Sequence, residues 1–351
     1  MPSFMKNFLT PPTSLKTSGS RQVGLLLIAV QGLLCAAGTA RAASRVVAWG
    51  DINYNLTDLS IRPSKPREAR IVAIAAGELH SLALFSDGIV TAWGDNRFGQ
   101  TSIPAQLKWG RVVGIAAGNV HSLALMGDGT VVAWGPSAGQ YGDFGQCTVP
   151  ARLKHAVAVA AGALHSLALK RDGTVAAWGF DVYGQCDVPP ELRHVVAIAG
   201  GMYHSLALRD DGMVVAWGND SLGQTDVPEG LSNVVAIAAG GFHSLALKDD
   251  GTVVFWGANG LIRGDVPAGL ADVVAIASGD YHSLALKNDR EMVAWGENSA
   301  GQCDVPLGLR NVAAIAARGS HSMVLIHETP SEAPHHFDRD FDWEFNRRDL
   351  R

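Results

Sequence analysis

One short pattern recurs seven times along this 351-residue chain and limits what the chain can fold into. In each copy a Trp-Gly pair closes one apolar run and a His-Ser pair opens another. The tryptophans of these pairs are Trp49, Trp93, Trp134, Trp178, Trp217, Trp256 and Trp295, and the histidines are His80, His121, His165, His204, His243, His282 and His321. Successive copies of about 40 residues are typical of proteins in which one supersecondary unit stacks on the next.

The unit from Val234 to Pro267 shows how one copy is built. Its apolar runs Val234–Ala239, His243–Leu247 and Val253–Gly257 are short and rich in Val, Leu and Ile, so we predict strands. The Asp-Gly pair before the third run predicts a hairpin turn. A shorter, more polar fourth strand is expected to end in Asp-Val-Pro, because proline suits an outer edge strand. Four strands in about 40 residues predict one blade of a β-propeller.

Side-chain size alternates along these runs. In the first run Val235 and Ile237 share one face, while Ala236 and Ala238 share the other. The second run alternates leucine with serine and alanine. Because neither face is strongly polar, we expect large residues of one blade to nest against small residues of the next.

The two ends of the repeat region complement each other. The region begins with a run of the third type, Val46–Gly50, and ends with runs of the first and second types, Val312–Ile326. Joining them in one sheet leaves no blade incomplete and removes exposed sheet edges. The sequence therefore predicts an all-β fold, a seven-bladed β-propeller with 2+2 strand closure between the N- and C-terminal segments.

The first 43 residues have the pattern of an export signal. Basic residues precede an apolar run, Val23–Ala37, and Ala40–Ala42 forms an A-x-A cleavage pattern. The run is about 15 residues long, whereas a membrane span needs roughly 20, although an uncleaved anchor is the alternative. We expect residues 1–43 to be a removed signal peptide, residues 44–326 the propeller, and residues 327–351 a charged, disordered tail. The mature protein would be secreted or periplasmic, without membrane attachment.

Charge and cysteine content narrow the class of partner and the chemistry. The formal net charge of −5 argues against nucleic acid, which is bound by basic surfaces that displace counterions. After the signal three cysteines remain, each in a Gly-Gln-Cys phrase: Cys147, Cys186 and Cys303. Because these phrases belong to different blades, we expect free, half-buried thiols that are too far apart for disulfides.

Two of the recurring phrases resemble a known repeat. They are Ala-Ala-Gly-x-x-His-Ser-Leu-Ala-Leu and the Trp-Gly-Asp-Asn-x-x-Gly-Gln form seen at Val90–Gln100, and both resemble the regulator of chromosome condensation repeat family. The resemblance extends from Val46 to about Ile326 and implies a seven-bladed propeller. The short repeats look most like the bacterial branch, which includes a propeller-type β-lactamase-inhibitory protein, a secreted binder. The family's founder is a nucleotide exchange factor for a small nuclear GTPase, a role that an exported, acidic chain without a long hairpin insertion fits poorly.

Three copies depart from the pattern at turn positions. Arg318 replaces the glycine that ends the first run, Asp289–Arg290 replaces Asp-Gly, and Ile262–Arg263 replaces Gly-Gln. We expect these changes to weaken turns in the last two blades without altering the number of blades.

The seven repeated histidines invite a metal or catalytic interpretation, but a ring argues against it. Equivalent positions of different blades lie far apart, whereas a metal needs three or four ligands at about 2 Å. We predict that each imidazole is a structural group bonded to a neighbouring backbone, and that the tryptophans belong to the core. The sequence contains no G-x-S-x-G, HExxH, P-loop or CxxC motif. We therefore predict no catalytic residue, metal or cofactor, and no enzymatic activity.

The positions that vary between copies concentrate in two sets of loops. In a meander, the loop between the first and second strands and the loop after the third emerge on the same side. One of them, Pro136 to Gln146, is longer than its counterparts. Aromatic residues are enriched at interfaces, and the resemblance extends the inhibitory protein's aromatic contacts to these positions; the alternative is that some residues only cap the mouth of the ring. The predicted partner-binding residues are Leu79, Phe98, Val120, Tyr141, Phe144, Leu164, Phe180, Tyr183, Tyr203, Phe242 and Tyr281.

These observations favour a secreted, non-enzymatic propeller that binds an unidentified protein through aromatic loops on one face, as a monomer and without nucleic acid. One alternative is a guanine-nucleotide-exchange or signalling scaffold of the chromosome-condensation-regulator type, which requires that the N-terminus is not a signal. A second is a propeller enzyme, such as a lyase or glycosidase, which requires carboxylates clustered at the axis.

Overall fold

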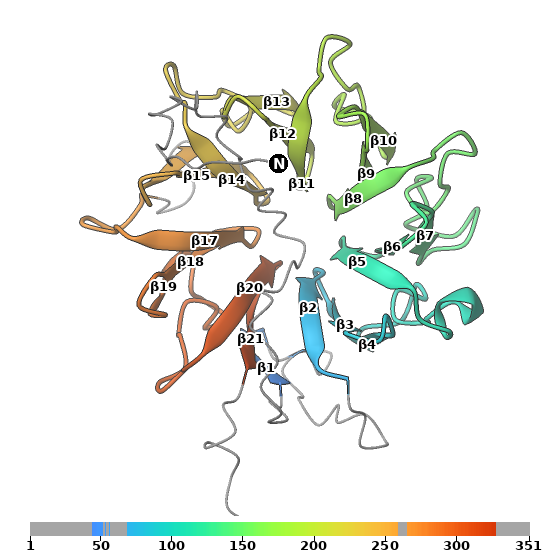
Figure 1. Cartoon of the computed structure of the whole chain (residues 1–351), viewed down its shortest axis with the longest axis horizontal. Coiled ribbons are helices and arrows are strands. Elements are labelled where there is room, and N and C mark those ends of the chain that lie inside the picture. Colours follow the sequence, from blue (N-terminus) through green and yellow to red (C-terminus); the bar gives the residue numbers. More distant parts are fainter. Residues whose placement is uncertain (1–43, 52, 54–55, 57–68, 259–264, 328–351) are drawn as a thin grey trace, which may run out of the picture.

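The predicted strands form seven separate sheets around a central axis (Figure 1). The computed structural model describes residues 44–51, 53, 56, 69–258 and 265–327. The expected signal peptide and the tail beyond His327 lie outside the described residues. Of the helices in the described part, such as the short 3-10 helix η2 (Ala105–Leu107), none has the length and apolar character needed to span a bilayer.

We number the blades along the chain, with the closing blade as the seventh. Their strands are, in blade order, β2 (Ile71–Ala76), β3 (His80–Phe85) and β4 (Val90–Gly94); β5 (Val112–Ala117), β6 (Ser122–Met126) and β7 (Val131–Trp134); β8 (Ala156–Ala161), β9 (His165–Lys170) and β10 (Val175–Gly179); β11 (Val195–Gly200), β12 (His204–Arg209) and β13 (Val214–Gly218); β14 (Val234–Ala239), β15 (His243–Lys248) and β16 (Val253–Gly257); β17 (Val273–Ser278), β18 (His282–Lys287) and β19 (Met292–Gly296); β20 (Val312–Arg318), β21 (His321–His327) and β1 (Ser44–Gly50).

The closing blade joins the two ends of the propeller. Its strand order is β1-β21-β20, and the antiparallel register pairs Val47 with Val324. β20 in turn packs beside β2 of blade one, so the first strands of all blades form an unbroken ring (Figure 1). The predicted seven-bladed fold with terminal closure is confirmed, with one N-terminal and two C-terminal strands in the described part of the closing sheet.

The expected fourth strand of each blade is wrong for the described residues, because every sheet there has three strands. The segments that end in Asp-Val-Pro use their backbone N–H groups in local turns instead. In blade three, Asp187 donates to Gly184, Val188 to Cys186 and Leu192 to Pro189, over 2.9 to 3.1 Å. These bonds occupy the donors that an edge strand would need for a ladder.

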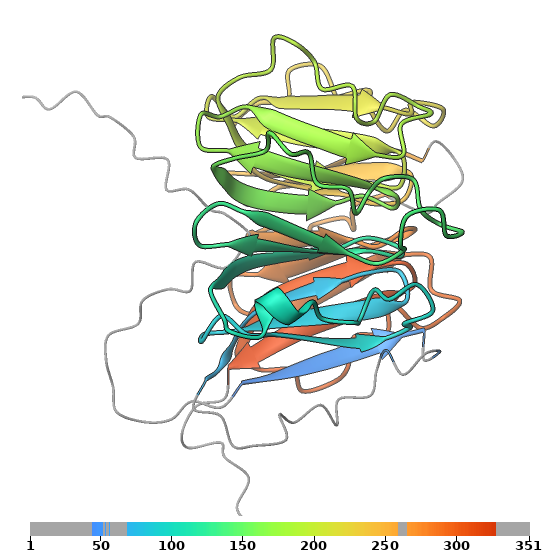
Figure 2. The same ribbon diagram turned by 90° about the vertical axis from the view of Figure 1, so that its right-hand side faces the viewer.

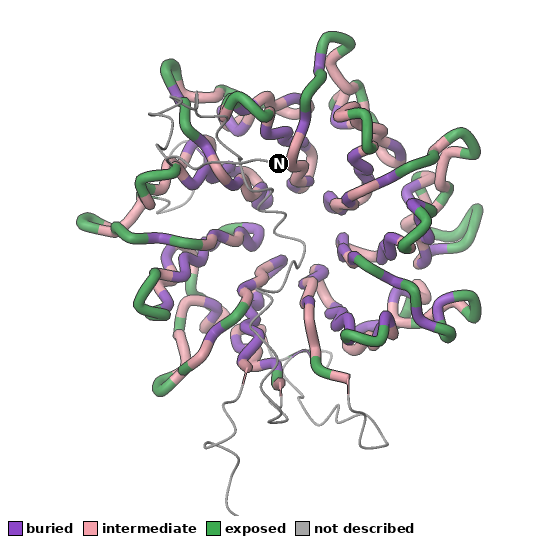
Figure 3. Tube along the Cα trace, viewed as in Figure 1, coloured by how far each residue is buried: buried purple, intermediate pink, exposed green. Residues whose placement is uncertain are grey.

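The hydrophobic core lies between blades rather than within them. Each of its seven clusters joins two neighbouring blades. Between blades four and five, Leu206 and Leu208 pack against a face that carries the small residues Ala239 and Ala246 beside Trp256. The predicted nesting of large against small residues is therefore present, and buried residues follow the strands while exposed ones gather in the loops (Figure 3).

A ring of hydrogen bonds links all seven blades. Each repeated histidine places its Nε2 atom 2.8 to 3.2 Å from the serine hydroxyl of the next blade. The bond between His321 and Ser81 joins the last blade to the first. The imidazole partner is thus a neighbouring side chain, where the sequence predicted a neighbouring backbone group.

The serine hydroxyls and the tryptophans share one acceptor. Ser122 Oγ and Trp134 Nε1 both donate to the backbone carbonyl of Gln100 in the preceding blade, at 2.8 Å each. The same pair of bonds reaches the carbonyls of Gln146, Gln185, Gln224 and Gln302. The backbone carbonyl of the glutamine in the Gly-Gln phrase therefore connects one blade to the next, a role that the repeat pattern alone does not reveal.

Hydrogen bonding and burial determine the protonation state of these histidines. Because Ser122 donates its one proton to Gln100, His80 Nε2 must carry the proton in their bond, and His80 Nδ1 is a buried acceptor without a hydrogen-bond partner. Burial lowers the pKa of six of the histidines to about 3 and that of His321 to about 4. The ring is therefore neutral near pH 7.

Candidate protein-binding face

Two sets of loops form one face of the ring. In blade one the pairing of His80 with Gly94 brings the loop between β2 and β3 beside the segment after β4. The Asp95 N–H then donates to the Leu79 carbonyl at 2.7 Å, and other blades repeat this bond. Figure 2 shows the blades edge-on, with loops at both ends of the strands. We call this side the aromatic face and define it by residues 51, 77–79, 95–104, 118–121, 135–150, 162–164, 180–189, 201–203, 219–228, 240–242, 265–267, 279–281, 297–306 and 319–320.

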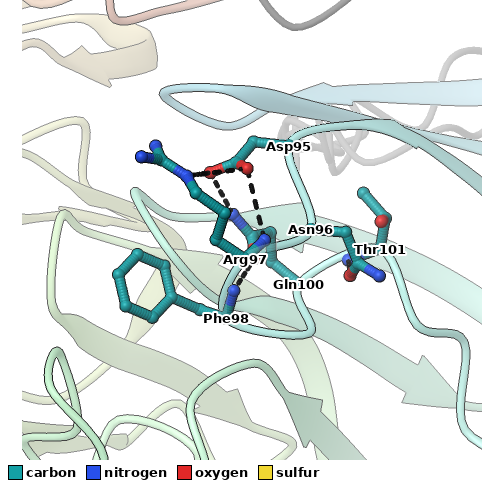
Figure 4. A network of polar contacts seen from close by, with 6 residues as sticks. All are labelled: Asp95, Asn96, Arg97, Phe98, Gln100 and Thr101. Carbon is teal, nitrogen blue, oxygen red and sulfur yellow. Dashed lines mark hydrogen bonds and ion pairs between the residues drawn. The ribbon is translucent and has the colours of Figure 1, made fainter.

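A glutamine side chain shapes the loop that follows the third strand in five blades, and Figure 4 shows this loop in blade one. In blade one, Gln100 Oε1 accepts from the Phe98 N–H at 2.9 Å, and Gln100 Nε2 donates to Asp95 at 3.1 Å. Asp95 also holds the Arg97 guanidinium group at 3.0 Å. The Thr101 N–H donates to the Asn96 amide oxygen at 3.0 Å, which closes the turn.

The same glutamine bond fixes the backbone of a position whose side chain varies among these five blades. Its backbone donor lies two positions before the glutamine and belongs to Phe98, Phe144, Tyr183, Leu222 and Ala300 in blades one, two, three, four and six. The backbone of this position is thus held by the repeat itself, while its side chain is free to vary. The recurring Gly-Gln phrase was the signal in the sequence that could have shown this.

The structure brings the predicted aromatic residues together in three groups. In the largest, the ring of Phe180 lies 5.1 Å from that of Phe144 and 6.0 Å from that of Tyr203, and Tyr203 lies 5.1 Å from Tyr183. The second group is Phe98 with Tyr141 at 6.4 Å, and the third is Phe242 with Tyr281 at 5.5 Å. These groups follow one another over blades one to six.

Exposure divides the predicted residues into an outer and an inner set. The outer set is exposed by 91% at Tyr141, 46% at Phe144, 46% at Tyr183 and 39% at Tyr281. The inner, half-buried set is Leu79, Phe98, Val120, Leu164, Phe180, Tyr203 and Phe242. The long loop of blade two folds over part of the inner set, since a Cβ on Gly142 would lie 3.6 Å from Phe98 and 3.9 Å from Val120. The inner residues thus support the outer ones.

Arg318 crosses the centre of the ring on this side. Although it ends β20 of blade seven, its guanidinium group donates to Gly200 of blade four at 3.1 Å and to Asn119 of blade two at 3.2 Å. It also lies 3.8 Å from the buried carboxylate of Asp280 in blade six. The sequence predicts a weakened turn here, yet Arg318 pairs with His321 and closes the hairpin. Its side chain connects blades that are not neighbours.

Turn departures elsewhere are also accommodated. Arg290 takes a φ of 73°, close to the 80° of Gly251 at the same turn position, and the hairpin between β18 and β19 forms normally. Residues 262 and 263, the third departure, lie outside the described residues.

Reactive side chains of the described chain are not gathered into a metal or thiol centre. No group of three or more His, Cys, Asp and Glu there could hold a metal ion. Cys147, Cys186 and Cys303 are free and half-buried, as the sequence predicts. Burial raises the pKa of the first two thiols to about 12 and that of Cys303 to about 11, so all three stay protonated near pH 7.

The closed ring, with a tryptophan and a histidine at each joint, defines a seven-bladed propeller built from one tandem repeat. The chain belongs to the family of the regulator of chromosome condensation (RCC1) repeat, whose model matches residues 71–100, 112–146, 156–185, 195–224, 234–261 and 273–302. No curated protein matches the chain.

Solved structures share this fold over most of the chain. Prp20p from Saccharomyces cerevisiae is 23% identical, with a TM-score of 0.64 and coverage of 83% of this chain and 93% of that one. Human WBSCR16 is 20% identical, with a TM-score of 0.64 and coverage of 82% and 99%. A chain from the complex of Kap60 with yeast RCC1 (Prp20) is 21% identical, with a TM-score of 0.66 and coverage of 93% and 97%. At these identities the similarity establishes the fold.

Family membership indicates a protein that works by binding other proteins or as an exchange factor. Prp20p itself is described by its binding to Gsp1p and histones.

Proposed function

We propose that this protein is a secreted, non-enzymatic propeller that binds one protein partner through the aromatic face, as a monomer. The observation that carries the proposal is the gathering of eight aromatic side chains on this face, four of them exposed. Clustered aromatic residues supported by a half-buried layer are the usual anchors of protein interfaces. Export is supported by the basic start, apolar run and A-x-A pattern of residues 1–43.

The binding test compares the wild type with the triple variant Phe144→Ala/Tyr183→Ala/Tyr281→Ala. The partner retained by the wild type from the native growth medium is purified, and its Kd is measured for each variant. Loss of these anchors should weaken binding at least ~30-fold, since one anchor can contribute about 2 kcal/mol. An unchanged Kd overturns the assignment of this face.

Trp109→Ala is the matched control, because Trp109 is 87% exposed and follows η2 outside the aromatic face. It should leave the Kd within about twofold, as surface residues outside an interface do. N-terminal sequencing of the natural protein tests export: a start at Ala43 or Ser44 supports it, and an intact Met1 overturns it.

A further inference from the structure

The charges of the aromatic face are almost all of one sign. The described residues of this face include one arginine, Arg97, and no lysine, and the buried Arg318 lies at its centre; each of the two arginines lies beside an aspartate, Asp95 or Asp280. The other carboxylates of the face form no ion pair with lysine or arginine within the part of the chain that the structure describes. They are Asp51, Glu78, Asp143, Asp181, Asp187, Asp220, Asp226, Asp265, Glu297 and Asp304.

The opposite side of the ring belongs to the part of the described chain whose charges nearly balance, because the described residues outside the aromatic face and Arg318 include 14 lysines and arginines against 12 aspartates and glutamates. We call this opposite side the hairpin face and define it by the turns between second and third strands, residues 86–89, 127–130, 171–174, 210–213, 249–252 and 288–291. Neighbouring lysine or arginine residues pair with Asp172, Asp211, Asp250, Asp289 and Glu291 of these turns. The excess negative charge of the described propeller therefore lies on the aromatic face.

The carboxylates alternate with the aromatic anchors along the same loops. Asp143 precedes Phe144, Asp181 follows Phe180, and Asp280 precedes Tyr281. Asp220 and Asp226 lie close enough to repel each other, and the Asp220 carboxylate raises the pKa of Asp226. A cation placed between such groups would relieve their repulsion.

We infer that the partner is a protein whose contact surface presents arginine or lysine side chains around an apolar centre; this inference rests on the proposed function. Opposite potentials speed association and select the partner, while like charges exclude acidic competitors. An arginine suits this face in two ways, because its guanidinium group stacks on aromatic rings and pairs with carboxylates.

The probe is a phage library of random, disulfide-closed twelve-residue peptides, panned on the immobilised wild-type protein. Peptides that lose binding to Phe144→Ala/Tyr183→Ala/Tyr281→Ala use the aromatic face. We expect these peptides to be enriched in arginine and lysine, and their Kd to rise at least ~10-fold when NaCl is raised from about 50 mM to about 500 mM.

The variant Asp181→Asn/Asp220→Asn removes two negative charges from the aromatic face. It is conservative because other blades have asparagine at the same position of the loop. Asp181 and Asp220 accept a backbone N–H with the same oxygen that Asn96 and Asn298 use in blades one and six. The loops should therefore keep their shape, and peptide binding should weaken about 3- to 10-fold.

Asp172→Asn/Asp250→Asn removes the same charge from the hairpin face and should change the Kd less than about twofold. Neutral or acidic peptides that depend on the aromatic residues would overturn this inference and leave the proposed function standing. Recovery of no peptide that depends on the aromatic residues would overturn the proposed function as well.

Discussion

The aromatic face and the hairpin face come from the same seven repeats but use them differently. On the hairpin face the turns are nearly alike, and lysine–aspartate pairs recur from blade to blade. On the aromatic face one backbone hydrogen bond recurs, from the position two before the glutamine, while the side chain at that position changes from Phe98 to Ala300. The side chain at a loop position can therefore vary between repeats where a recurring hydrogen bond fixes the backbone of that position.

The largest effect is expected at the contacts between blades, beneath the aromatic face. Lowering the pH protonates all the repeated histidines at these contacts together. Their folded pKa of about 3 to 4 lies below the ordinary value of 6.5, so the unfolded chain binds more protons between these limits. The contribution of these neutral histidines to the free energy of unfolding is present above about pH 6.5. It is lost as the pH falls toward 3, by roughly 1 kcal/mol per histidine per pH unit below 6. Urea midpoints should therefore drop steeply between pH 7 and pH 5.

His194→Asn is the control for this titration. His194 is exposed on the side of the hairpin face, and Asn233 and Asn311 occupy the same left-handed position in other blades. The variant should keep the same pH dependence. A urea midpoint that stays level from pH 7 to pH 5 contradicts the neutral ring.

Two glycines, Gly162 directly after β8 and Gly114 within β5, should respond differently to substitution by alanine. A Cβ on Gly162, at the aromatic end of β8, would overlap the His165 imidazole and lie 2.7 Å from the Gly201 carbonyl. Gly162→Ala should lower the free energy of unfolding by about 3 kcal/mol or more, because the packed joint must shift.

Gly114, near the hairpin end of β5, provides the matched case. A Cβ there would meet nothing closer than Leu125 at 3.6 Å, and other blades have alanine at this position, as at Ala73. Gly114→Ala should leave stability unchanged or raise it by up to about 1 kcal/mol. Equal destabilisation of both variants in urea unfolding would contradict the histidine–glycine contact.

Arg318 tests how far the centre of the aromatic face depends on contacts across the ring. Arg318→Met keeps much of the side-chain volume but leaves Asp280 buried without its cation, and should cost about 2 to 3 kcal/mol. Adding Asp280→Asn should restore part of this loss. A double-mutant cycle by urea unfolding with no coupling between the two positions would contradict the ion pair.

The smallest effect is expected on the hairpin face. The Lys248–Asp250 pair is 3.1 Å long but exposed to solvent, so Lys248→Ala should change the free energy of unfolding by less than about 0.5 kcal/mol. Thermal unfolding measures this change. A loss as large as that of Arg318→Met would contradict the expectation that an exposed ion pair contributes little to stability.

Much of this architecture follows from local patterns. Alternation along Val234–Ala239 predicts a strand, and two antiparallel steps put Tyr203 and Tyr183 on the same side of their blades. The prediction of a fourth strand is wrong because local turns around Pro189 use the backbone N–H groups that a strand would need for its ladder. The aromatic face is more acidic than the hairpin face because loops from several blades converge on the aromatic face. A single repeat does not show this difference in charge.

Sequence alone specified the number of blades, the closure of the two ends and the side on which the aromatic loops emerge, because each depends on short-range periodicity. The hydrogen bonds between blades, in contrast, depend on the tertiary structure. His80 meets Ser122, and Arg318 reaches Gly200, only because stacking brings together groups 42 and 118 positions apart. Such contacts depend on the curvature of the closed ring, since each repeat meets its neighbours at a geometry that the whole set of blades imposes.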